Sequence, residues 1–123
     1  MTNTTPRILV VEDEKPLARA LQLKLDHAGC AVTVAHNGTK AKLLLDTEQF
    51  DLVITDLVMP ETNGFEVIKY AKEKQAGAPV VVLSNLGQET DVKKVNELGV
   101  EDYFVKANTP ITTIIQHIKQ LLE

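Results

Sequence analysis

Short apolar runs rich in β-branched residues recur along the chain and alternate with more polar stretches. The five runs, in chain order, are Ile8–Val11, Val32–Val34, Leu52–Thr55, Val80–Leu83 and Tyr103–Val105. The first, third and fourth are apolar without alternation, as in strands that are covered on both faces. The second run alternates, so it predicts a strand at the edge of the sheet.

After each run, apolar residues recur at the spacing of one helix face. The five stripes lie within Leu17–Ala28, Ala41–Leu45, Gly64–Ala71, Val92–Leu98 and Ile111–Leu122. Pro16 stands at a first helical position, Gly99 ends the fourth stripe, and Thr109 is a candidate cap before Pro110 and the last helix. Asn37-Gly38 has the composition of a hairpin turn, but the helical period that follows favours a helix.

Strict strand-then-helix alternation predicts parallel strands that are joined by right-handed helical crossovers. The chain has 123 residues, which suits one domain and is too short for two full cores. We therefore predict an α/β fold with a doubly wound, five-stranded parallel sheet in the order 2-1-3-4-5 and helices on both faces. One domain is expected over residues 1–123, with a core of about residues 7–122.

Charged and hydroxyl side chains stand where the predicted central strands end. Glu12-Asp13 follow the first run, Asp56 the third, Ser84 the fourth and Lys106 the fifth. In a parallel sheet these ends share one edge, and the first and third strands would lie about 4.8 Å apart. Three carboxylates are therefore expected to converge in the crevice where such folds bind ligands.

Converging carboxylates repel one another, so something must neutralise them. A hard divalent cation such as Mg²⁺ would do so, and the alternative is that one carboxylate stays protonated. Beside a metal-held phosphate donor, Asp56 would be the nucleophile that forms an aspartyl phosphate. Lys106 would offset charge on the phosphoryl oxygens, and Ser84 would hydrogen-bond one of them.

With these residues the chain resembles the receiver domain of bacterial two-component response regulators, the CheY-like superfamily, over essentially its full length. The matching pieces are Val10–Glu14, Asp51–Pro60, Asn63–Glu66, Ser84 and Asp102–Lys106. The resemblance implies the flavodoxin-like, three-layer α/β/α fold of that superfamily. It also implies a stand-alone, single-domain regulator, while a longer parent protein stays open.

The resemblance assigns roles to the residues at the strand ends. Asp56 would be the phosphoacceptor, and Glu12 and Asp13 would form the acidic pair that holds Mg²⁺ together with Asp56. The main-chain carbonyl of Val58 would be a further metal ligand. Ser84 and Lys106 would sense the phosphoryl group, and Tyr103 would be the switch aromatic that turns inward in response.

The implied function is a phosphorylation-dependent signalling switch of a two-component system or phosphorelay. The phosphoryl group would come from a sensor histidine kinase or a histidine phosphotransfer protein. A downstream protein would then recognise the face formed by the fourth helix, fifth strand and fifth helix. Such a protein catalyses only its own phosphorylation and dephosphorylation and is not otherwise an enzyme.

Two departures from the family pattern lie beside the sensing pair. Ala107 stands where a proline in a cis bond is usual, and a cis bond before alanine costs about 3–4 kcal/mol. We expect either a trans Lys106-Ala107 bond with a rearranged loop or a strained cis bond. Asn85 replaces a usually small residue and is expected either to narrow phosphoryl access or to add a hydrogen bond.

Two further departures concern the surroundings of Asp56. Val58 and Leu86, two positions beyond Asp56 and Ser84, are apolar and cannot orient an attacking water, which predicts slow self-dephosphorylation. Asn63 stands where aspartate is common, and we expect this change to be neutral.

Composition limits location and partners. A net charge of -4 disfavours direct nucleic-acid binding, and the single cysteine, Cys30, excludes an internal disulfide and fits a reducing compartment. The polar start and the short apolar runs predict no signal peptide and no membrane segment, hence a cytoplasmic protein. Lys119 is the only Lys or Arg in the last helix, which favours a monomer or a weak phosphorylation-dependent dimer.

Other interpretations are open at this stage. A pseudo-receiver would keep the fold as a phosphorylation-independent interaction module, which Asn85 and Ala107 favour and the retained acids and Lys106 disfavour. Ser84 could instead cap a helix, and Tyr103 could simply pack in the core. Glu12-Asp13-Glu14 would repel a flavin phosphate, and Asp56-Leu57-Val58 lacks the Asp-x-Asp of haloacid dehalogenase phosphatases, so neither enzyme class fits.

Overall fold

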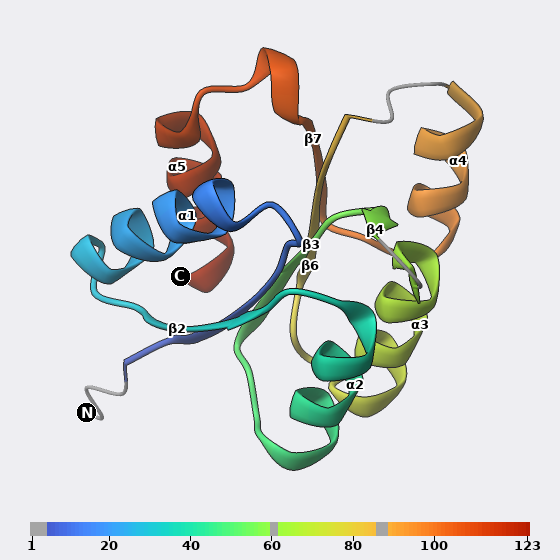
Figure 1. Ribbon diagram of the computed structural model, residues 1–123, viewed down its shortest axis with the longest axis horizontal. Coiled ribbons are helices and arrows are strands. Elements are labelled where there is room, and N and C mark those ends of the chain that lie inside the picture. The colour runs from blue at the N-terminus through green and yellow to red at the C-terminus, as the bar shows by residue number, and fades with distance from the viewer. Residues whose placement is uncertain (1–4, 60–61, 86–88) are drawn as a thin grey trace.

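A computed structural model of the chain describes residues 5–59, 62–85 and 89–123. Its main sheet has five parallel strands in the order β2-β1-β3-β6-β7, so the predicted order and fold class are confirmed (Figure 1). The strands are β1 (Arg7–Val11), β2 (Ala31–Ala35), β3 (Leu52–Thr55), β6 (Val80–Ser84) and β7 (Asp102–Val105). β2 lies at an edge, as its alternating pattern predicted.

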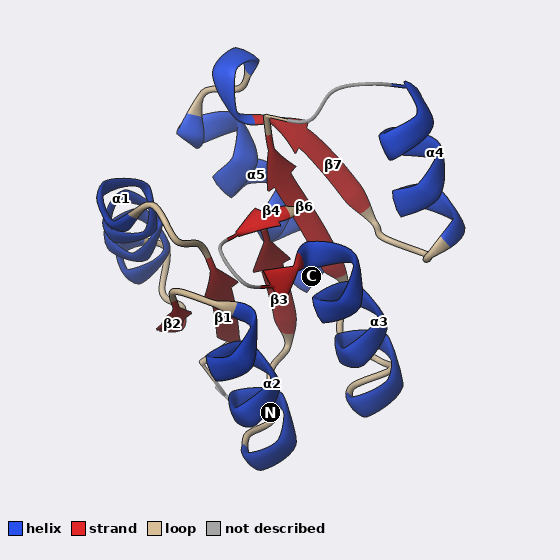
Figure 2. Cartoon of the chain, turned by 45° about the vertical axis from the view of Figure 1, so that its right-hand side comes forward, coloured by secondary structure: helices blue, strands red, loops and turns tan. Residues whose placement is uncertain are grey.

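Helices cover both faces of the sheet, with α1 and α5 on one face and α2, α3 and α4 on the other (Figures 1 and 2). They are α1 (Lys15–His27), α2 (Gly38–Thr47), α3 (Gly64–Lys74), α4 (Glu89–Glu97) and α5 (Ile111–Leu122). In the described ranges, none of them is both long and apolar enough to span a bilayer.

The continuous apolar strands fill two separate cores because successive side chains point to opposite faces. In β1, Leu9 and Val11 pack under α2, α3 and α4, whereas Ile8 and Val10 pack under α1 and α5. All four side chains are at most 1% exposed. Burial on both faces explains why the central strands show no polar alternation.

Local signals start and end the helices largely as the sequence indicates. Pro16 lies in the first turn of α1, and the Asn37 side chain accepts a hydrogen bond from the Lys40 amide at 2.8 Å, which caps α2. Gly99 has a positive φ of 82° after α4. The expectation for Thr109 was wrong, because Pro110 is the N-cap residue of α5 and, among the described residues, no side chain caps the start of this helix.

Three short elements lie outside the predicted pattern. β4 (Val58–Met59) and β5 (Thr62–Asn63) form an antiparallel pair just after β3, and the 3-10 helix η1 (Lys106–Asn108) follows β7. Two or three residues are too few to show a period, so sequence patterning cannot detect them. Both β4 and η1 border the carboxyl edge of the sheet.

A buried glutamine at the C-terminal end of α3 forms hydrogen bonds with the end of α2 and the segment between α2 and β3. Gln75 is 6% exposed; its side-chain oxygen accepts from the Phe50 amide, and its side-chain nitrogen donates to the carbonyls of Leu45 and Glu48. These backbone groups would be unpaired without it.

Replacing Gln75 with alanine should therefore lower the free energy of unfolding by about 2–3 kcal/mol, because unpaired buried groups cost about 1–3 kcal/mol each. Urea denaturation measures this loss. Gln116→Ala on the exposed face of α5 is the matched control and should change stability by less than about 0.5 kcal/mol. Equal stability of the two variants would contradict the structural role of Gln75.

Candidate functional site

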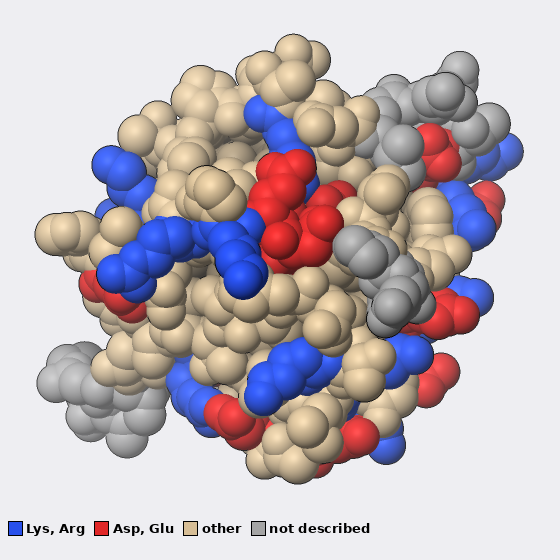
Figure 3. Space-filling view, in the orientation of Figure 1, with Lys and Arg blue, Asp and Glu red and all other residues tan. Residues whose placement is uncertain are grey.

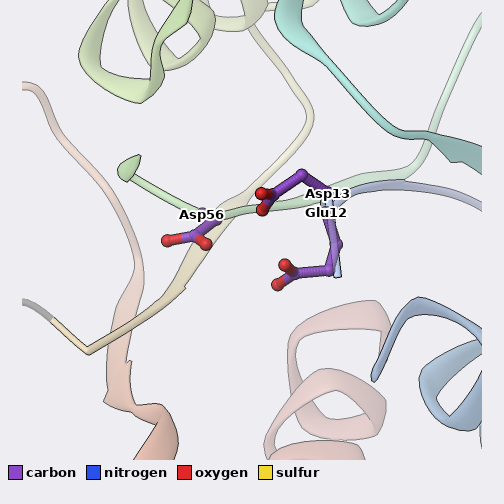
Figure 4. A group of neighbouring side chains, drawn as sticks. All are labelled: Glu12, Asp13 and Asp56. Atoms are coloured by element: carbon purple, nitrogen blue, oxygen red, sulfur yellow. The ribbon is translucent and has the colours of Figure 1, made fainter. Parts of the chain in front are cut away.

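Three carboxylates meet at the carboxyl edge of β1 and β3. These strands are paired as far as Val11 and Thr55, and the Asp56 amide still donates to the Val11 carbonyl at 3.1 Å. Glu12, Asp13 and Asp56 each offer one oxygen, and these oxygens lie within 4.8 Å of one another. Figure 4 shows the three side chains extending toward a common space, so the predicted convergence is present.

Lys106, the first residue of η1, supplies the opposing charge. Its Nζ lies 2.8 Å from Asp56 Oδ2 and 2.9 Å from Glu12 Oε1, with Glu14 further away at 3.8 Å. The Lys106, Glu12 and Asp56 side chains are 9%, 2% and 6% exposed, respectively. The cation therefore lies among buried acids and is not a solvated lysine.

Burial and pairing shift the pKa values of these groups. Burial raises the pKa of Glu12, and the hydrogen bonds from Lys106 and the Glu14 amide only partly oppose that increase. Burial by itself would lower the pKa of Lys106, but its hydrogen bonds to Asp56 and Glu12 outweigh this effect and raise the pKa above its ordinary value. Lys106 therefore stays charged over the physiological range.

The Asp56 carboxylate has a defined orientation. Its Oδ1 accepts hydrogen bonds from the backbone amides of Leu57 and Val58 at 2.7 and 3.2 Å, which leaves Oδ2 facing Lys106. The following turn is closed by the Gly64 amide, which donates to the Leu57 carbonyl at 3.0 Å. A Cβ atom at Gly64 would lie 2.2 Å from the Asp56 carbonyl oxygen, so Gly64 packs closely on Asp56. The sequence analysis missed this positioning residue.

Asp13, Asp56 and Lys106 line a cavity of about 300 Å³ that opens at the carboxyl edge of the sheet. Val58 and Ser84 also line it. Ser84 is the buried last residue of β6 and precedes α4 by several residues, so it is not a helix cap. Figure 3 shows a cluster of acidic side chains at the centre of the face in view, with basic side chains beside it.

Tyr103 lies in β7, with its ring packed against the core under α2, α3 and α4. Within the described part of the chain, its buried hydroxyl has no hydrogen-bond partner. Burial raises the pKa of Tyr103, with smaller contributions from Asp91 and Asp56. Tyr103 therefore packs against the core, and its role as the switch aromatic stays a prediction.

The two departures beside Ser84 and Lys106 have structural outcomes. The described residues contain no cis peptide bond, so the Lys106-Ala107 bond is trans, and Lys106 at the start of η1 still bonds Asp56. Asn85 adds a hydrogen bond, since its Oδ1 accepts from the Ala107 amide at 3.2 Å. Neither partner in this bond could be inferred from spacing alone.

Of the residues in the remaining two departures, the structure describes Asn63 and Val58 but not Leu86. Asn63 caps α3, because its Oδ1 accepts from the Phe65 amide at 2.8 Å. A carboxylate would do the same, which gives a reason for the expected neutrality. Val58 is exposed beside Asp56, whereas Leu86 lies outside the described residues, so the expected slow dephosphorylation stays a prediction.

The donor set fits a hard divalent cation. All three groups of the cluster offer carboxylate oxygens, the ligands that Mg²⁺ takes together with retained water. No thiol or imidazole belongs to this cluster, which disfavours a softer metal such as Zn²⁺. The residues present are therefore suited to Mg²⁺.

Comparison with known proteins identifies the class of protein. The model of the response regulator receiver domain family matches residues 8–119, and the chain belongs to this family. Structurally it is similar to the receiver domain of the Francisella response regulator 1452 (28% identity, TM-score 0.86, 96% and 97% of the two chains covered). It is also similar to a BeF3-activated DrrB receiver domain (28% identity, TM-score 0.87, 97% and 98% covered).

In sequence, the chain is similar to the transcriptional regulatory protein ResD of Bacillus subtilis, with 36% identity over 121 residues and 98% of this chain covered. The chain spans about half the length of the curated relatives it matches, 49% in the case of ResD. Membership of the family implies phosphorylation-dependent two-component signalling. Receiver domains are generally non-enzymatic modules that bind Mg²⁺ in an acidic pocket and interact with histidine kinases or phosphotransfer proteins.

Proposed function

We propose that this chain is a phosphorylation-dependent switch in which Asp56 accepts the phosphoryl group, within a single receiver unit of about residues 7–122. The observation that carries the proposal is the convergence of three carboxylates beside one cavity, together with a buried lysine that bonds Asp56. The donor would be a phosphohistidine on a sensor kinase or phosphotransfer protein. An Asp56 carboxylate oxygen forms a bond to phosphorus while the P–N bond of the donor phosphohistidine breaks. The electron pair of the broken bond stays on the imidazole nitrogen.

The chain's own residues prepare this transfer. The amides of Leu57 and Val58 hold the carboxylate in place, so that one oxygen faces the cavity where the donor enters. Lys106 neutralises phosphoryl charge after moving a short distance from Asp56. Ser84, in the wall of the same cavity, hydrogen-bonds a phosphoryl oxygen.

Glu12, Asp13 and Asp56 would hold Mg²⁺, with the carbonyl of Val58 as a further ligand. When bound, the metal supplies positive charge that stabilises the transferring phosphoryl group. Among the described residues, Lys106 is the only cationic side chain within 4.0 Å of the Glu12 and Asp56 carboxylates.

The surface formed by α4, β7 and α5 would differ between the phosphorylated and unphosphorylated states. Tyr103 in β7 has a buried hydroxyl without a partner within the described segments, and pairing it would favour an alternative arrangement of this face. A downstream protein that prefers the phosphorylated arrangement would bind there, with the receiver as a monomer or a weak dimer. The pseudo-receiver alternative receives no support from a site in which the acceptor, acidic pair and lysine converge.

Amide NMR with beryllofluoride and Mg²⁺ tests the acceptor. In the wild type, we expect chemical-shift changes around Asp56, Ser84 and Tyr103, because the complex imitates an aspartyl phosphate. Asp56→Asn should abolish them, and Asp26→Asn, an exposed substitution on α1, should retain them. A wild type that binds Mg²⁺ but ignores beryllofluoride would favour the pseudo-receiver, and an unchanged response in Asp56→Asn would exclude Asp56.

A further inference from the structure

Asn85 and Ala107 form one hydrogen bond across the edge of the cavity. The Ala107 amide donates to Asn85 Oδ1 at 3.2 Å. Asn85 directly follows Ser84, the last residue of β6, and Ala107 directly follows Lys106, the first residue of η1. The bond therefore connects the two backbone segments that carry the Ser84 and Lys106 side chains.

The bond needs an acceptor side chain at position 85 and a residue other than proline at position 107. The donor is a backbone N–H, so the atom of the Asn85 amide that faces it is the oxygen. A proline at position 107 would have no N–H to donate, and an alanine or glycine at position 85 would have no acceptor. The two substitutions thus complement each other, although they lie 22 positions apart in the sequence.

The bond lies in the wall of the candidate phosphoryl site. Asn85 lines the acceptor cavity together with Asp56, Ser84 and Lys106. It also lines an adjoining cavity of about 280 Å³ on the side of α1 and α5, to which Ala107 contributes. Asn85 therefore stands between the two cavities, where a change in its position alters the spacing of the groups behind it.

We propose that Asn85 is a positioning residue for phosphoryl binding, acting through its hydrogen bond with the Ala107 amide. The bond holds Ser84 and Lys106 at the spacing that a phosphoryl group requires, so that less ordering remains when the group arrives. This inference rests on the proposed function of Asp56. The metal-binding carboxylates follow β1 and β3, which the bond does not join, so phosphoryl and Mg²⁺ affinity should respond separately.

The test measures two affinities in each variant, for Mg²⁺ alone and for beryllofluoride at saturating Mg²⁺. Asn85→Ala should weaken beryllofluoride binding by about three- to tenfold, the effect of one net hydrogen bond, while Mg²⁺ affinity stays within about twofold. Ala107→Pro should weaken it similarly. The double variant should bind beryllofluoride no more weakly than the single variant that binds it less well, because both changes remove the same bond.

Hydrogen exchange of the Ala107 amide provides a readout independent of phosphoryl binding. Asn85→Ala should speed this exchange by about three- to tenfold, and Asn85→Asp should retain slow exchange because it keeps an acceptor oxygen. Any one of three results for Asn85→Ala would overturn this inference but not the proposed function. They are unchanged exchange of the Ala107 amide, unchanged beryllofluoride affinity, and a fall in Mg²⁺ affinity that parallels the fall in beryllofluoride affinity. A wild type that does not bind beryllofluoride would overturn the proposed function as well.

Discussion

Replacing Lys106 with methionine should lower the free energy of unfolding by about 3 kcal/mol in metal-free buffer near neutral pH. Methionine keeps an unbranched apolar stem, so the substitution removes the charge with little loss of packing. Glu12 and Asp56 would then face each other, buried and without their shared cation. Removing one partner of a buried ion pair costs about 3–5 kcal/mol, and partial protonation of Glu12, whose pKa is already raised, reduces the loss.

Magnesium should recover most of that loss, because a bound divalent cation neutralises the same carboxylates. Urea denaturation with and without Mg²⁺ measures both effects, and the gain on adding Mg²⁺ should be larger in Lys106→Met than in the wild type. Lys69→Met, at an exposed position on α3 with no ion pair within the described segments, is the control. An equal deficit with and without Mg²⁺ would show that Lys106 acts through packing alone.

Gly64→Ala should have a comparable effect through the backbone. A Cβ atom at this position would lie 2.2 Å from the Asp56 carbonyl oxygen and 2.5 Å from Leu57 Cα. Backbone atoms cannot move away as a flexible side chain would, so the turn between β3 and α3 must open. We expect a loss of about 3 kcal/mol in the free energy of unfolding and a roughly tenfold weaker affinity for Mg²⁺, since Asp56 is displaced.

Gly77→Ala is the matched control for this prediction. Apart from its chain neighbours, no atom of the described residues lies within 4 Å of a Cβ built at Gly77, and its backbone is outside the left-handed region. Alanine there should change stability by less than about 1 kcal/mol, with a small gain expected from the less flexible unfolded chain. Urea denaturation and Mg²⁺ titration of both variants give the comparison, and a Gly64→Ala protein as stable as Gly77→Ala would contradict the role of Gly64.

Periodicity predicted the sheet and helices well because burial leaves a regular trace in the sequence. The central strands are covered on both faces, so β1 and β6 contain the unbroken apolar runs Ile8–Val11 and Val80–Leu83, and the last helix repeats isoleucine on its buried side. Elements without such a repeat were not predicted, as β4, β5 and η1 show. The N-cap of α5 was misassigned because Thr109 has the right chemistry but lies one residue too early.

The convergence of the acidic residues was also predictable, because topology alone brings the carboxyl ends of β1 and β3 together. Glu12, Asp13 and Asp56 needed only the strand order to be placed side by side. The position of Lys106 needed more, since it depends on how η1 turns after a trans bond to Ala107. From the sequence, that bond could be either cis or trans.

By itself, the sequence of this protein determined the order of its strands, the edge of the sheet where its chemistry lies and the residue types gathered there. These properties follow from hydrophobic spacing and chirality, which act along the chain. Only the tertiary structure decided that Lys106 bonds Asp56 and Glu12, that Gly64 packs on the Asp56 carbonyl and that Asn85 bonds Ala107. Such contacts depend on how segments remote in sequence pack against one another, and spacing along the chain does not encode that packing.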